Sequence, residues 1–116
     1  MEKVTIWHNP RCSKSRETLA LLQARDIEPT VVEYLKTPPS VAELERALEL
    51  LGLEVRSLIR DNEEAYARLN MGDPTLSQGR LLQLMHDNPI LIQRPVVFAN
   101  GRARIGRPPE AVLEIL

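Results

Sequence analysis

The residues best suited to chemistry in this sequence are Cys12 and the cations around it. Cys12 is the single cysteine of the chain, and Arg11, Lys14 and Arg16 all lie within four residues of it. Nearby positive charge stabilises the thiolate, which is the form of cysteine that acts as a nucleophile. A lone cysteine can also be a small buried structural residue, but the three cations favour an activated thiolate.

The cysteine count limits what such a thiolate can do. Two-electron reduction of an oxyanion by thiols consumes two thiols, and Ser15 occupies the position of the second cysteine in C-x-x-C oxidoreductases. We therefore expect the second thiol to come from outside, with glutathione or a glutaredoxin as the obvious cytosolic donors. The chain cannot form an internal disulfide. Its two histidines, His8 and His86, lie too far apart in sequence to complete a zinc cluster with Cys12.

The elements expected around Cys12 place it where α/β proteins bind ligands. Residues 4–7 predict a strand, residues up to about 25 a helix, and residues 30–35 a second strand parallel to the first. Cys12 falls in the turn that begins the helix. Unpaired backbone N–H groups and the positive end of the helix dipole favour a thiolate there, and the same groups can bind an oxyanion.

The first helix has a predicted start and a predicted inner face. Either Ser13 or Ser15 can supply the N-terminal cap, because serine side chains accept hydrogen bonds from the first free N–H groups. The apolar side chains of the helix predict that Leu19, Ala20 and Leu22 face the core.

Residues 40–87 are predicted to form a helical block without a strand. Ser40 and Glu43 form a capping box, and Gly52 ends the helix that they begin. Apolar residues recur along this helix at i, i+3, i+4 and i+7, namely at Leu44, Ala47, Leu48 and Leu51. Three further short helices are expected over residues 55–60, 65–69 and 78–87.

The C-terminal part predicts two strands and a closing helix. Asn100-Gly101 joins the apolar runs 95–98 and 103–105, which is typical of an antiparallel hairpin, and Pro109 begins a helix over 110–116. The element order is β-α-β, a helical insertion at about 40–87, then β-β-α. This order predicts an α/β thioredoxin-like fold with a mixed sheet, in a single domain of residues 1–116.

An oxyanion site also needs forked donors, which arginine provides better than lysine. Arg60 ends a predicted helix, Arg94 precedes a strand, and Arg107 precedes the closing helix, so these three are candidate ligands, although any single arginine can be a solvated surface charge. His8 can either pair with the thiol or hold the loop by hydrogen bonds. The candidate residues that support the loop are Asn9, Ser15 and Pro95, the last as a possible cis-proline.

Composition narrows the classes of partner. The chain has 116 residues, 43% of them hydrophobic and 27% charged, with a net charge of −1, so no basic surface predicts nucleic-acid binding. Its apolar runs are too short to span a membrane, and the first of them follows Met1-Glu2-Lys3 directly, without the pattern of a signal peptide. We expect a cytoplasmic monomer.

Several motifs together resemble the glutaredoxin-coupled arsenate reductase (ArsC) family. They are His8-Asn9-Pro10-x-Cys12, Thr37-Pro38-Pro39, Val55-Arg56-x-Leu58-x-Arg60, Asn88-Pro89-Ile90-Leu91, Arg94-Pro95-Val96-Val97 and Arg107-Pro108. The similarity extends from Val4 to Leu116, and the form NPRCSKSR is closest to a housekeeping branch of the family.

The resemblance implies an activity and a role for each motif residue. Cys12 would attack arsenate or a similar oxyanion, and His8 would tune its thiol. The oxyanion ligands would be Arg60, Arg94 and Arg107. Glutathione would act as co-substrate and glutaredoxin as reductant, releasing arsenite without a bound cofactor or metal.

Other functions are open to the same residues. A glutathione-dependent reductase of another substrate would use the same thiolate. An Spx-like regulator that binds RNA polymerase shares the fold, although redox-sensing members usually carry C-x-x-C. The phosphatase-like arsenate reductases need C-x5-R and further cysteines, and residue 18 is Thr18, so we exclude that class.

Overall fold

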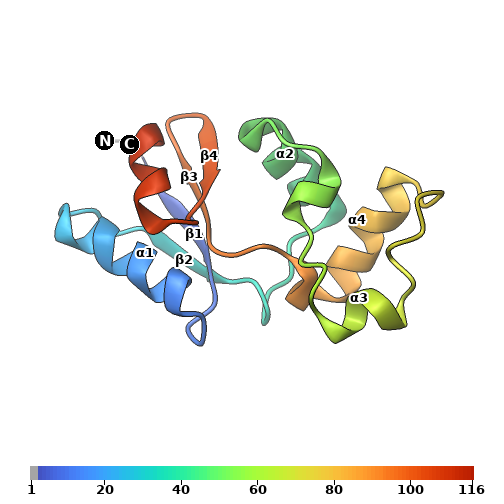
Figure 1. Cartoon of the computed structure of the whole chain (residues 1–116). Coiled ribbons are helices and arrows are strands. Elements are labelled where there is room, and N and C mark those ends of the chain that lie inside the picture. The colour runs from blue at the N-terminus through green and yellow to red at the C-terminus, as the bar shows by residue number, and fades with distance from the viewer. Residues whose placement is uncertain (1–2) are drawn as a thin grey trace. The chain divides into compact units, whose positions relative to one another are not determined.

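A mixed four-stranded sheet is the framework of one of two structural units. The computed structural model describes residues 3–116 (Figure 1). The first unit holds the described residues up to Thr37 together with Arg94–Leu116, and the second holds Pro38–Gln93. The predicted helical insertion at about 40–87 lies inside the second unit. That residues 1–116 form a single domain stays a prediction.

The N-terminal part forms the predicted β-α-β unit. Strand β1 (Thr5–His8) is followed by helix α1 (Ser13–Ala24) and strand β2 (Thr30–Glu33). β1 and β2 are parallel, in a register that pairs Thr5 with Thr30 and His8 with Glu33, as predicted. The carboxyl end of β1 therefore leads directly into the turn that carries Cys12.

The predicted hairpin completes the sheet. Strands β3 (Val96–Ala99) and β4 (Arg102–Ile105) are antiparallel, and Asn100 and Gly101 between them have φ angles of 53° and 71°. Such left-handed pairs fit two-residue hairpin turns. β3 also pairs antiparallel with β1, which gives the order β2-β1-β3-β4. The mixed sheet confirms the predicted fold class.

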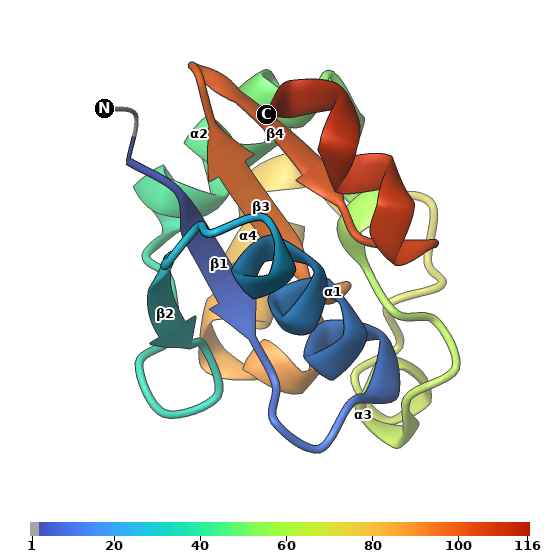
Figure 2. The same cartoon turned by 90° about the vertical axis from the view of Figure 1, so that its left-hand side faces the viewer.

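One face of the sheet is covered by α1 and by the closing helix η3 (Pro109–Ile115) (Figure 2). Strand alternation sends Ile6 and its partner Val97 into the core, where both are fully buried. Val112 and Ile115 of η3 pack into the same core. Helix η3 is a 3-10 helix, whereas the sequence predicted a closing helix without distinguishing the 3-10 form from the α form. Two consecutive prolines, Pro108 and Pro109, stand at its start and have no backbone N–H to donate.

Helix α1 corrects two predictions. Neither Ser13 nor Ser15 caps the helix, because Cys12 is the N-cap residue and its side chain makes no capping hydrogen bond. Ala20 is exposed rather than buried. The buried face is formed by Ser15, Thr18 and Leu22, with Leu19 partly buried against the core. Short polar side chains occupy the inner face here because each bonds to a nearby group, which removes the cost of burial.

The second unit is built from helices, as predicted. These are α2 (Val41–Leu51), η1 (Val55–Leu58), α3 (Glu64–Arg68), α4 (Gln78–Asp87) and η2 (Pro89–Leu91). The capping box of Ser40 and Glu43 is present, and Gly52 ends α2 with a φ of 68°. The leucine and alanine stripe of α2 is buried. Within residues 3–116, none of the helices combines the length and apolarity that crossing a membrane requires.

Candidate active site

The turn between β1 and α1 holds Cys12 by its backbone. The Cys12 N–H donates to the Asn9 carbonyl at 3.0 Å, and the Cys12 carbonyl accepts from the Arg16 N–H at 3.0 Å. The residue is 8% exposed. These bonds place the sulfur at the start of α1, where the free N–H groups of the first turn point towards it.

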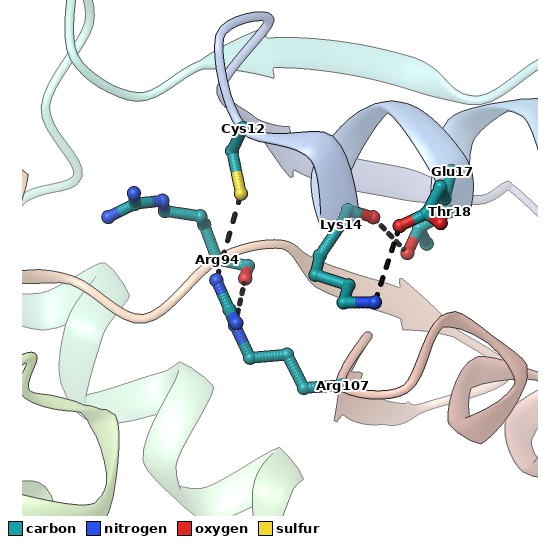
Figure 3. Close-up of polar contacts among 6 residues, drawn as sticks. All are labelled: Cys12, Lys14, Glu17, Thr18, Arg94 and Arg107. Carbon is teal, nitrogen blue, oxygen red and sulfur yellow. Dashed lines mark hydrogen bonds and ion pairs between the residues drawn. The ribbon is translucent and has the colours of Figure 1, made fainter.

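Two arginines from distant parts of the sequence lie beside this sulfur (Figure 3). The Arg107 Nη2 donates to the Cys12 Sγ at 3.7 Å, and the Arg107 Nε donates to the Arg94 carbonyl at 2.9 Å. Arg107 follows β4, and Arg94 precedes β3. Both arginines are followed by cis peptide bonds, to Pro95 and to Pro108, of which the first was suggested by the sequence.

The surroundings of Cys12 lower the pKa of its thiol. Burial is the largest single influence and raises the pKa, since a charged sulfur loses solvation. The Ser15 N–H, the Arg94 guanidinium and the Lys14 N–H act together in the opposite direction and outweigh burial. The net effect is a pKa below the ordinary value for cysteine, which favours the nucleophilic thiolate.

The Arg94 guanidinium has unused donors. Its Nε and Nη1 are buried and find no hydrogen-bond acceptor within the described part of the chain. Buried donors without an acceptor are costly and rare in folded proteins. Close to a cysteine and to the start of a helix, they suit an incoming oxyanion, which would accept from the guanidinium fork.

His8 and Ser15 form a buried pair beneath the turn. The Ser15 Oγ accepts from the Asn9 N–H at 3.0 Å and lies 2.6 Å from the His8 Nδ1. Burial lowers the pKa of His8; Glu33 raises it and Arg16 lowers it further, with a net decrease. A neutral ring can accept the serine proton at Nδ1. Of the two roles considered for His8, this bond corresponds to holding the loop.

Gly106 and Thr18, which were not among the candidates from the sequence, lie where the Arg107 turn meets α1. A Cβ atom placed on Gly106 would lie 2.5 Å from the Thr18 Oγ1 and 2.8 Å from the Pro95 Cγ. The Gly106 N–H also donates to the Pro95 carbonyl at 2.9 Å. Only a residue without a side chain fits this approach, so Gly106 sets where Arg107 begins. The available signal was a single glycine between a strand and a candidate arginine.

Arg60 belongs to the second unit. Its N–H donates to the Leu91 carbonyl at 2.7 Å, and its Nε lies 3.9 Å from the Glu63 Oε1. The side chain is 13% exposed. Its predicted part in binding an oxyanion stays a prediction.

A comparison of the sequence with known protein families covers the residues of this candidate site. The model of the ArsC family matches residues 7–115, from the end of β1 to the end of η3. The chain belongs to the ArsC family. The match covers the Cys12 turn and the segments that carry Arg94 and Arg107, so it confirms the resemblance inferred from the motifs.

Individual ArsC relatives align with nearly the whole chain. The uncharacterized protein YfgD of Escherichia coli is 55% identical over 99% of this chain and 98% of its own. The arsenate reductase of Rhizobium meliloti is 53% identical over 97% of this chain and 81% of its own. The solved structure of an arsenate reductase from Vibrio cholerae superimposes with a TM-score of 0.97 at 57% identity, covering 98% of both chains.

Proposed function

We propose that this ArsC-family protein reduces arsenate to arsenite, using glutathione and glutaredoxin as the source of electrons. The observation that carries the proposal is the contact of the Arg107 guanidinium with the Cys12 sulfur at 3.7 Å, next to the unused donors of Arg94. A nucleophile and forked cationic donors at one point suit a tetrahedral oxyanion. The names of the relatives from Rhizobium meliloti and Vibrio cholerae support arsenate as that oxyanion.

The first step uses the Cys12 thiolate as nucleophile. It attacks the arsenic atom, so that an S–As bond forms while an As–O bond breaks, and the departing oxygen takes up protons and leaves as water. Arg94 and Arg107 stabilise the negative charge on the remaining oxygens. Donors aimed at developing charge in this way usually supply a large part of a rate enhancement. Arg60 is proposed as a further oxyanion ligand.

The electrons come from two external thiols. Glutathione displaces a second oxygen as water and joins the arsenic through its sulfur. A glutaredoxin thiolate then attacks that glutathione sulfur and forms a mixed disulfide, and the electron pair of the broken S–As bond stays on arsenic. Water releases arsenite and restores the Cys12 thiol. Ser15 explains the need for outside thiols, because it stands where a resolving cysteine would complete the reaction within one chain.

The remaining site residues have supporting roles in this proposal. Asn9 holds the Cys12 N–H, and Ser15 links the Asn9 N–H to His8. His8 tunes the thiol through the loop that it holds, and Pro95 fixes the chain that follows Arg94. Cytoplasm, where glutathione keeps thiols reduced, is the compartment that such chemistry needs.

The test is a coupled assay with arsenate, glutathione, glutaredoxin, glutathione reductase and NADPH. The proposal predicts arsenate-dependent NADPH oxidation that disappears in Cys12→Ser and when glutaredoxin is left out. If the wild-type protein gives no rate above background while the coupling enzymes are active, arsenate reduction is not its function. Binding to RNA polymerase without such turnover would point to the regulatory class instead.

A further inference from the structure

Thr18 lies on the inner face of α1 and is fully buried. Its hydroxyl donates to the Lys14 carbonyl, one turn earlier in the helix, at 2.8 Å (Figure 3). This bond satisfies the buried hydroxyl and holds the branched side chain in one orientation. Residue 18 would be the arginine of a C-x5-R loop, and a threonine cannot supply forked donors of that kind.

The Thr18 side chain meets the turn at Gly106 with both of its branches. A Cβ atom on Gly106 would lie 2.5 Å from the Thr18 Oγ1 and 3.2 Å from the Thr18 Cγ2. The Pro95 Cγ would lie 2.8 Å from the same point. Gly106 therefore sits between Thr18 and Pro95, so a larger group at either place would displace the turn.

Both arginines beside the sulfur are attached to this contact. Pro95 directly follows Arg94, and Gly106 directly precedes Arg107. The Gly106 N–H donates to the Pro95 carbonyl at 2.9 Å, and the Arg107 Nε donates to the Arg94 carbonyl at 2.9 Å. These two bonds hold the two turns together, so a displacement of Gly106 also moves the guanidinium groups.

The bond of Thr18 to Lys14 leads to the other donors at the sulfur. Burial raises the pKa of the Cys12 thiol, and the Ser15 N–H, the Arg94 guanidinium and the Lys14 N–H outweigh it. Two of these donors belong to the first turn of α1, and the third belongs to the turn before β3. Thr18 touches both sides, since it bonds to the first turn of α1 and packs against Gly106.

We propose that Thr18 is a positioning residue that sets the distance between the first turn of α1 and the turns carrying Arg94 and Arg107. Donors from the helix and from both arginines then converge on one tetrahedral anion beside the Cys12 sulfur. A hydroxyl suits this place because oxygen is smaller than a methyl group and is bonded to the helix. The identity of the anion rests on the proposed function, whereas the spacing also acts on the free thiol.

The experiment measures alkylation of Cys12 by iodoacetamide. The thiolate displaces iodide, so that an S–C bond forms while the C–I bond breaks, and intact-mass spectrometry follows the rate. The rate depends on the thiolate fraction, so its pH profile gives the pKa of the thiol. Arsenate is then added as the probe, and the concentration that protects Cys12 gives an apparent Kd without any turnover.

Thr18→Val tests the hydroxyl. Valine keeps the branched shape, but it loses the bond to the Lys14 carbonyl and can place a methyl group where Oγ1 meets Gly106. We expect a raised pKa of the Cys12 thiol and an apparent Kd for arsenate that is about tenfold higher, because the positioned donors are displaced. Thr18→Ala removes both branches and is expected to change both quantities in the same direction, which keeps the test available if the larger methyl group prevents folding.

Thr18→Ser is the conservative variant. Serine retains the hydroxyl and can make the same bond to the Lys14 carbonyl, while it loses only the Cγ2 methyl group. We expect it to keep the wild-type pKa and apparent Kd. Ile115→Val is the control for stability, because it removes a buried methyl group from the core beneath α1 without changing the Gly106 contact. It should also keep the wild-type pKa and apparent Kd, and urea denaturation shows how far each variant is destabilised.

A wild-type pKa and apparent Kd in both Thr18→Val and Thr18→Ala overturn the proposal. Losses of equal size in Thr18→Ser or in Ile115→Val overturn it too, since the hydroxyl would then not be their cause. The alkylation assay also separates this proposal from the proposed function. A protein that does not reduce arsenate but shows a raised pKa in Thr18→Val retains the role of Thr18, and a protein that reduces arsenate with both quantities unchanged lacks it.

Discussion

The Arg107 Nη2 lies 3.7 Å from the Cys12 Sγ, although the two residues are 95 positions apart in sequence. The same guanidinium donates through Nε to the Arg94 carbonyl at 2.9 Å. Two bonds from one side chain thus connect the start of α1, the turn after β4 and the loop before β3. The sheet topology brings these three segments to one end of the sheet, where the Arg94 guanidinium lowers the pKa of the Cys12 thiol.

Arg107→Lys tests the guanidinium fork. Lysine keeps the charge but cannot donate both to the Arg94 carbonyl and towards the sulfur. We expect kcat/KM for arsenate to fall about 100-fold, the usual loss when one donor to a developing oxyanion is removed. Steady-state kinetics in the coupled assay measure it. Arg25→Lys, at an exposed position at the end of α1, is the control and should retain the wild-type value. Equal loss in both variants would contradict a specific role for Arg107.

Ser15→Ala tests the buried support beneath the turn. It leaves the Asn9 N–H and the His8 Nδ1 without their partner in a site where both residues are under 9% exposed. Burial of groups that lose their partner costs about 1–3 kcal/mol, so the free energy of unfolding should decrease by that amount. Urea denaturation measures it. Ser13→Ala, two positions away and exposed, should stay within about 0.5 kcal/mol of the wild type. A neutral Ser15→Ala would show that this hydrogen-bond pair adds nothing to stability.

Gly106→Ala tests the close approach of the Arg107 turn to α1. The added methyl group would meet the Thr18 Oγ1 at 2.5 Å and the Pro95 Cγ at 2.8 Å, so one of these segments must shift. We expect a loss of about 1–3 kcal/mol in stability and at least a roughly tenfold loss in kcat/KM, because Arg107 moves with the turn.

Gly79→Ala is a control for which the opposite change in stability is expected. Gly79 lies in α4, and nothing lies within 4 Å of the position of its added Cβ. Alanine there should stabilise the protein by about 0.5–1 kcal/mol, since glycine is a poor helix former. If Gly106→Ala behaved like Gly79→Ala, the glycine would not be what sets the position of Arg107.

His8 predicts a pH dependence of stability. Burial lowers the pKa of His8 in the folded protein below the ordinary value of about 6.5 that applies to the unfolded chain. Its contribution is therefore complete above about pH 6.5 and is lost as the pH falls towards the folded-state pKa, because the unfolded chain then binds the extra proton. Urea denaturation at a series of pH values should show this decline, and His8→Asn, which does not titrate, should reduce it. An unchanged slope in His8→Asn would mean that other groups cause the decline.

Local sequence patterns predicted most of the fold. The parallel β-α-β unit, the capping box at Ser40 and the Asn100-Gly101 hairpin all depend on residues close in sequence, and all three are present. The N-cap of α1 was predicted wrongly. A serine near the start of a helix was expected to accept hydrogen bonds from the free N–H groups of the first turn, but the N-cap residue is Cys12. Ser15 instead turns inward to His8, which only the tertiary structure reveals.

The site was predictable in its residue types but not in its geometry. The position of the turn pointed to Cys12, but the influences that lower the pKa of its thiol are the Arg94 guanidinium and the N–H groups of Lys14 and Ser15, rather than the neighbouring cationic side chains from which activation was predicted. The approach of Arg107 depends on the missing side chain of Gly106 and on its contact with Thr18, which lie 88 positions apart in the sequence. The cavity between α1 and the start of η3 likewise has walls from two distant segments, so no sequence spacing indicates it.

Titration of the thiolate absorbance tests whether Cys12 is an activated thiolate beside Arg94 and Arg107. We expect a pKa below the ordinary cysteine value of about 8.5 in the wild-type protein, and a higher pKa in Arg94→Gln, because the guanidinium charge favours the thiolate. Cys12 is the only cysteine, so the signal belongs to one residue. A wild-type pKa at or above about 8.5 would mean that Cys12 is not an activated thiolate.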